Sequence, residues 1–136
     1  MLIMPTVQMS HTHNAAEWKQ STFIERQLII MAELIIEMLY FEDCPHWEYG
    51  LENLNSALKD EGMHDVDIHL VLINNEEDAR KEKFLGSPSF HFNGQDLWPE
   101  ERTSFQVACR VYHTEDGLKG YPSVEMLREQ IRAINS

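Results

Sequence analysis

The chain has 136 residues, 43% of them hydrophobic, which suffices for one domain with a single core. Its 23 acidic and 11 basic residues give a formal net charge of −12, and no run of Lys or Arg forms a basic patch, so nucleic acid is not expected as a partner. The longest apolar stretch, residues 28–41, contains Glu33 and Glu37, whereas a membrane-spanning helix needs roughly 20 nearly uninterrupted apolar residues, so no membrane association is expected.

The N-terminal residues predict an extension ahead of the main domain. Asn14 and Glu17 are spaced like a capping box before a series of apolar positions, which predicts a helix over residues 14–31. We therefore expect a tail and a helix within residues 1–33, followed by a folded domain over residues 34–136.

The first half of that domain reads as strand, helix, strand. Residues 34–41 are almost uniformly apolar, as in a strand buried on both faces of a partly parallel sheet. A helical pattern begins at the Cys-Pro step after this strand and ends at Gly62. Residues 65–73 predict a second strand, joined to the first by a right-handed crossover.

The second half reads as helix, hairpin, helix. Residues 76–84 predict a short charged helix, and Asn93-Gly94 between two short apolar runs predicts a hairpin. Residues 99–107 read as a polar loop, residues 108–112 as a further short strand or part of that loop, and residues 115–120 as a turn. Pro122 and Ser123 open a last amphipathic helix. The predicted fold is α/β, with the order β-α-β-α-β-β-α.

Two motifs lie at the ends of predicted strands, Cys44-Pro45-His46-Trp47 after the first and Gly86-Ser87-Pro88 before the hairpin. With the order of elements, they resemble the thioredoxin superfamily over residues 34–134. In that family a Cys-x-x-Cys motif caps the first helix and a cis proline lies beside its first cysteine. The resemblance implies a reactive thiol at Cys44 and a cis proline at Pro88. Trp47 replaces the second motif cysteine and so removes the usual resolving thiol.

The thiol of Cys44 is the first candidate for chemistry. A helix N-terminus favours the thiolate through its unpaired amides and dipole, and a protonated His46 would add to this, whereas Glu42 and Asp43 oppose it. We therefore expect a thiol of moderate acidity. The alternative is a small buried residue without reactivity.

Ser87 and Pro88 are the first candidates for substrate binding. A cis bond at Pro88 would expose the backbone N–H and C=O of Ser87 to an extended peptide beside the Cys44 sulfur, whereas a trans proline at the start of an edge strand would not. Trp47 and Tyr49 in the first helical turn line a groove or simply pack. The predicted substrate-binding residues are Pro45, His46, Trp47, Ser87, Pro88 and Arg110.

The second thiol, Cys109, lies in Ala-Cys-Arg-Val-Tyr. It resolves a mixed disulfide if the fold brings it close to Cys44, and is otherwise a buried structural cysteine. Arg110 holds a substrate carboxylate or makes a surface ion pair. The absence of Cys-x₂-Cys and His-x₃-His spacings predicts no zinc site, and no cofactor is implied.

The same cysteines support a second comparison. Their Cys-Pro, Gly-Ser-Pro and Ala-Cys-Arg layout resembles a family of small chains labelled after organomercurial lyases. This resemblance implies two thiolates and a carboxylate on one mercury atom, for which Cys44, Cys109 and Asp43 are the candidates.

Three functions remain open from the sequence. The leading one is a cytoplasmic thiol protein with monothiol redox or thiol-transfer activity through Cys44, whose partner is a thiol, a disulfide or a peptide; the absence of a secretory signal and the presence of two cysteines favour it. The second is a redox-silent module that binds a peptide beside Pro88. The third is organomercurial lyase-like chemistry.

Overall fold

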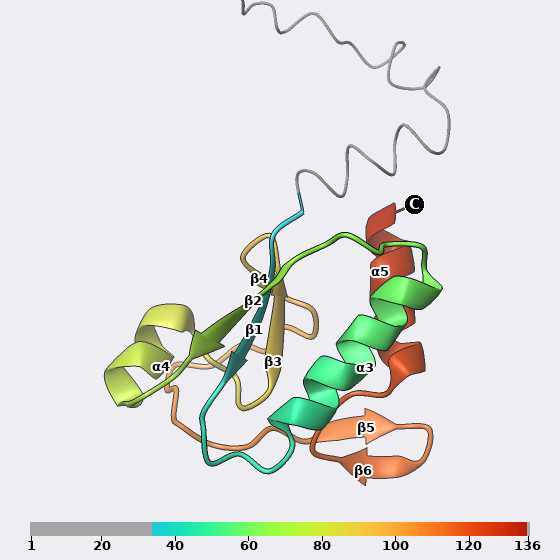
Figure 1. The fold of residues 1–136 in the computed structure, drawn as a ribbon. Helices are drawn as coiled ribbons and strands as arrows, with labels where there is room; N and C mark the ends of the chain where they lie inside the picture. The colour runs from blue at the N-terminus through green and yellow to red at the C-terminus, as the bar shows by residue number, and fades with distance from the viewer. Residues whose placement is uncertain (1–33, 136) are drawn as a thin grey trace, which may run out of the picture. The chain divides into compact units, whose positions relative to one another are not determined.

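The computed structural model describes residues 34–135, and the helix predicted over residues 14–31 lies outside them (Figure 1). The described residues form three helices and six strands, a mixed α/β arrangement that confirms the predicted class. In chain order the elements are β1 (Ile36–Tyr40), α3 (Trp47–Asp60), β2 (Ile68–Leu72), α4 (Glu76–Glu82), β3 (Ser89–Phe92), β4 (Gln95–Asp96), β5 (Tyr112–Thr114), β6 (Gly117–Lys119) and α5 (Val124–Asn135). None of these helices is long and apolar enough to cross a bilayer.

Strand β1 lies inside a four-stranded mixed sheet with the order β2-β1-β3-β4. It pairs in parallel with β2, with Met38 opposite Leu70, and antiparallel with β3, with Met38 opposite Phe90. Strand β4 then pairs antiparallel with β3. The parallel pair requires the α3 crossover between β1 and β2, as the sequence pattern predicts.

The two faces of the sheet carry different parts of the core. Successive side chains of a strand point to opposite faces, so Met38 and Leu39 of β1 are both fully buried but in different layers. Leu39 packs with Ala79 of α4 and Phe84 in one cluster. Helices α3 and α5 lie side by side, away from α4 (Figure 1).

The first helix begins later than predicted. The N-cap of α3 is His46, so Cys44 lies in the loop before the helix rather than at its start. Cys44 therefore precedes the N-cap by two residues. The C-terminal end agrees with the prediction, since α3 ends just before Gly62, whose φ is 80°.

The turn between β3 and β4 has the predicted chemistry. Asn93 and Gly94 both have positive φ, 54° and 83°, as a two-residue hairpin turn requires. The Asn93 side chain also accepts a hydrogen bond of 2.8 Å from the backbone of Ile35, next to β1. The turn thus anchors the end of β3 beside β1, and at the other end of β3 Ser89 pairs with Leu39 of β1, just after the Ser87–Pro88 bond.

The segment after residue 107 departs from the prediction. The region expected to be a turn, residues 115–120, has its turn at residues 115–116 but also contains β6, which pairs with β5 so that Lys119 lies opposite Tyr112. The observed order therefore contains two strands more than the predicted one, because β5 and β6 form a separate two-stranded sheet. Helix α5 begins as predicted, with the Ser123 hydroxyl accepting a hydrogen bond from the backbone of Met126.

Candidate functional site

The Ser87–Pro88 bond is cis, as predicted, and it lies beside the loop that carries Cys44. The backbone N–H of Phe41 donates to the Ser87 hydroxyl at 3.3 Å. The Cys44 thiol donates to the Ser87 carbonyl, with a sulfur–oxygen distance of 3.6 Å. The loop after β1 and the loop before β3 are therefore in direct contact, which places the Cys44 sulfur against the cis bond.

A third segment, residues 108–110, completes the site; we call it the strap. The backbone N–H of Ser87 donates to the Ala108 carbonyl at 2.8 Å, and the Arg110 N–H donates to the Ser87 carbonyl at 3.0 Å. Cys109 is thus the bridge partner of Ser87. The expectation that the Ser87 backbone is free for a peptide is wrong, because the protein's own strap occupies both groups.

The strap brings the two cysteines together. Cys44 is only 4% exposed, whereas Cys109 is exposed, so the expectation of a buried Cys109 is also wrong. Although the residue is exposed, partial desolvation of its thiol raises the pKa of Cys109, and the nearby Cys44 side chain raises it further. The structure therefore contains a thiol pair with Cys109 on the solvent side and Cys44 beneath it.

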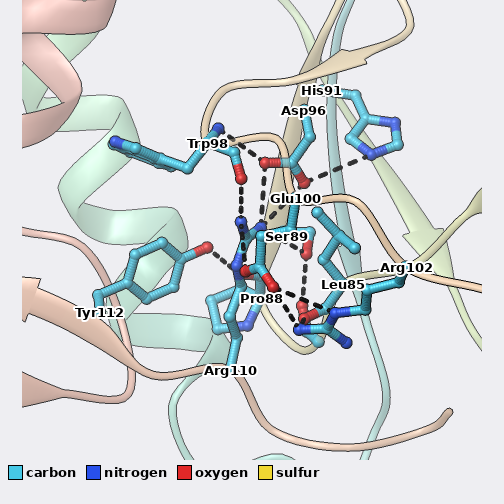
Figure 2. A network of polar contacts seen from close by, with 11 residues as sticks. Leu85, Pro88, Ser89, His91, Asp96, Trp98, Glu100, Arg102, Arg110 and Tyr112 are labelled. Carbon is cyan, nitrogen blue, oxygen red and sulfur yellow. Dashed lines mark hydrogen bonds and ion pairs between the residues drawn. The ribbon is translucent and has the colours of Figure 1, made fainter. Parts of the chain in front are cut away.

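Arg110 fixes the strap to the sheet (Figure 2). Its guanidinium donates to both carboxylate oxygens of Asp96, at 3.1 and 2.9 Å, and to the Ser89 hydroxyl at 3.1 Å. It also donates to the Trp98 carbonyl. The side chain is 4% exposed, so the predicted surface ion pair is instead a buried one. Since these donors are used within the protein, we do not assign Arg110 to a substrate.

Further contacts extend this network around the cis bond (Figure 2). The Tyr112 hydroxyl donates to the Pro88 carbonyl at 2.6 Å, and the Arg110 guanidinium lies 5.1 Å from the centre of the Tyr112 ring. Burial is the largest cause that raises the pKa of the Tyr112 phenol above its usual range, which keeps it a hydrogen-bond donor. On the far side of the carboxylate, His91 Nε2 lies 3.7 Å from Asp96 Oδ2. These contacts hold the C-terminal end of the strap against the sheet.

Helix α3 approaches the cis proline closely because it carries a glycine there. A Cβ at Gly50 would lie 2.9 Å from Pro88 Cγ and 3.2 Å from the Phe90 ring. Pro88 itself is fully buried. Trp47, in the first turn of α3, packs on Tyr40 with ring centroids 4.5 Å apart. Of the two roles considered for Trp47, lining a groove or packing, the structure therefore shows packing.

An open pocket of about 640 Å³ lies on the solvent side of Cys109. Its walls come from the start of α3 and from β6 with the residues that follow it, and the rings of Tyr49 in α3 and Tyr121 after β6 stack at 5.4 Å. A Cβ at Gly120 would overlap the His46 ring, so the absence of a side chain there lets the two walls meet. The strap contributes Cys109 to the pocket.

Only some of the predicted substrate-binding residues therefore line this pocket. His46 lines this pocket together with Cys109, whereas Pro45 is exposed outside it and Trp47 packs against β1. The wall formed by β6 was not expected from the sequence. A signal for it exists, since Asp116-Gly117 is a hairpin dipeptide and Gly117 has a φ of 99°.

Among the described residues, no three His, Cys, Asp or Glu side chains are grouped as metal ligands. Comparisons of the chain with protein-family models, with curated proteins and with solved structures find no match. We therefore infer the function from the geometry of the site.

Proposed function

We propose that this is a thioredoxin-like thiol–disulfide redox protein that works through Cys44 and Cys109 as a pair. The observation that carries the proposal is that both cysteines lie at Ser87, next to the cis bond: the Cys44 thiol donates to the Ser87 carbonyl, and Cys109 is the bridge partner of Ser87. Paired thiols that can exchange with an external disulfide are the basic requirement of such chemistry. The parallel β-α-β unit followed by an antiparallel hairpin supports the thioredoxin-like assignment.

The burial of the two sulfurs suggests the order of events. Cys109 is exposed and meets the substrate, whereas Cys44 is shielded by the strap. The Cys109 thiolate attacks a substrate disulfide, the sulfur–sulfur bond breaks, and one substrate thiol leaves after taking up a proton. Cys44 then attacks the Cys109 sulfur, the second substrate thiol leaves, and a Cys44–Cys109 bond forms. Two electrons pass from the protein to the substrate, and an external low-molecular-weight thiol reverses the exchange.

This order modifies the expected monothiol reaction at Cys44. A lone Cys44 would have to react from beneath the strap, and Trp47 offers no resolving sulfur. Cys109 supplies the second thiol that the motif lacks; in our proposal it attacks the substrate, and Cys44 resolves the mixed disulfide. The redox-silent peptide module receives no support, because residues 108–110 occupy the backbone groups of Ser87 that such a peptide would use.

A second candidate, a trap for a soft metal ion, is favoured by the same placement of both cysteines at Ser87. Two adjacent thiolates are suitable ligands for a thiophilic cation such as mercury. The lyase step would also need the Asp43 carboxylate. Asp43 lies exposed in the turn after β1, and no contact within the described part of the chain directs it towards the sulfurs, so we do not propose the lyase reaction.

The redox proposal is tested by trapping the intermediate. Cys44→Ser should stop the reaction with a small disulfide after one thiol is released, leaving a stable adduct on Cys109, because no second sulfur remains to resolve it. The parent chain should release two thiols and retain no adduct. Mass spectrometry of the intact chain and a colorimetric count of released thiol measure both quantities.

Cys109→Ser is the matched variant, and it should react at least roughly tenfold more slowly than Cys44→Ser because Cys44 is buried. An adduct that forms faster on Cys44 than on Cys109 would contradict the proposed order, and failure of both thiols to react would remove the redox function. The pH dependence is a further check. Because the pKa of Cys109 is raised, the rate should still increase with pH where a free cysteine is already fully ionised.

A further inference from the structure

We infer that the pocket beside Cys109 selects small disulfides that carry carboxylate groups. This inference rests on the proposed redox function and names the substrate class for it. The pocket volume of about 640 Å³ lies within the range of roughly 300–1,000 Å³ that is typical of small-molecule sites. The exposed Cys109 thiol is part of its wall, so a molecule that fills it meets the reactive sulfur.

The charge of the pocket differs from that of the protein as a whole. The chain has 23 acidic residues, yet no Asp or Glu is among the described residues that line this pocket. The lining does contain two basic residues, Arg110 and Lys119. The guanidinium of Arg110 is paired with Asp96, which leaves Lys119 as the cation available to a ligand among these lining residues. A carboxylate is the group that complements this wall.

The charges closest to the pocket decide which ligand it attracts, because salt screens the charges that lie farther away. At about 0.1 M salt the Debye length is roughly 10 Å, so exposed carboxylates farther away than this contribute little at the pocket. A carboxylate within a few ångströms of the Lys119 ammonium gains roughly fivefold in binding even in a water-like medium. The Lys119 ammonium therefore attracts a carboxylate that binds in the pocket.

The remaining surfaces of the pocket favour a small molecule over a protein chain. Val111 and Leu118 are 61% and 64% exposed and line it together with Tyr49, which gives an apolar surface for the short carbon chain of a ligand. An extended protein substrate would compete with the strap for the Ser87 backbone, whereas a small disulfide needs no backbone partner.

The test uses three small disulfides of similar size and different charge: dithiodipropionate, hydroxyethyl disulfide and cystamine, which are anionic, neutral and cationic. Their rates of reaction with the reduced full-length chain are divided by their rates with dithiothreitol, which removes differences in intrinsic reactivity. We expect the normalised rate to be highest for the anion and lowest for the cation. In Lys119→Met the anion-to-neutral ratio should fall roughly fivefold.

Lys59→Met is the matched control, since Lys59 lies exposed near the end of α3, outside the pocket lining, and its loss changes the net charge by the same amount. This control should keep the parental ratio. A ratio unchanged in Lys119→Met, a similar fall in both variants, or a preference for cystamine in the parent chain would overturn the inference while leaving the redox function standing. Failure of the parent to react with all three disulfides would instead overturn the redox function, and the inference with it.

Discussion

Arg110→Met is expected to lower the free energy of unfolding by about 3–5 kcal/mol, the usual cost of removing one partner from a buried ion pair. The loss would leave the Asp96 carboxylate charged and buried, with its Arg110 hydrogen bonds gone. It would also release the strap, since the Arg110 side chain ties it to Ser89 and Trp98. Equilibrium unfolding in urea measures the change.

Two further variants separate the buried charge from other effects of this substitution. Arg80→Met removes an exposed arginine whose carboxylate partner, Glu76, is one helical turn away, so it should cost only about 0.5 kcal/mol. Adding Asp96→Leu to Arg110→Met should recover part of the stability, because no uncompensated charge then remains buried. A loss below about 1 kcal/mol in Arg110→Met would contradict the anchoring role.

Gly86→Ala is expected to cost about 2–4 kcal/mol and to loosen the strap. Gly86 has a φ of 119°, and a Cβ there would lie 2.8 Å from Arg110 Cβ and 3.0 Å from Arg110 Cα. The backbone of Arg110 must then move away, which weakens its hydrogen bond to Ser87. We expect Cys44 to become accessible, so its rate of alkylation in the folded protein should rise roughly tenfold or more.

Gly117→Ala is the control for the backbone strain in this experiment. Gly117 also has a positive φ, 99°, but no atom of the described residues lies within 4 Å of the position that a Cβ would take, so only the strain of about 1 kcal/mol applies. This control should leave the alkylation rate of Cys44 unchanged. Equal effects of the two substitutions on that rate would show that the strap is not what shields Cys44.

The parts of the fold that could be predicted depend on local chemistry. Asn93-Gly94 predicts its hairpin because both residues tolerate positive φ, and the structure has it. The almost uniformly apolar residues 34–41 predict a strand, and β1 lies within them with Ile36, Met38 and Leu39 buried. The cis bond at Pro88 also follows from a local motif, read through a family resemblance.

The strap could not be predicted, because its position depends on contacts between distant segments. Residues 99–107 carry no regular pattern, so nothing in the sequence states where Cys109 lies relative to Ser87. The pairing of Arg110 with Asp96 is equally hidden, since arginine is rarely buried and a partner 14 residues away cannot be inferred from spacing. The occupied backbone of Ser87, which changes the functional conclusion, follows only from the folded structure.

The central claim, that Cys44 and Cys109 act as a pair, is tested most directly by oxidising the native full-length chain with diamide and mapping its cysteines by mass spectrometry. We expect a monomer that is lighter by two hydrogen atoms and a single cross-linked peptide pair joining Cys44 to Cys109. A disulfide between the Cys109 residues of two chains, or two cysteines that both remain open to alkylation, would contradict it.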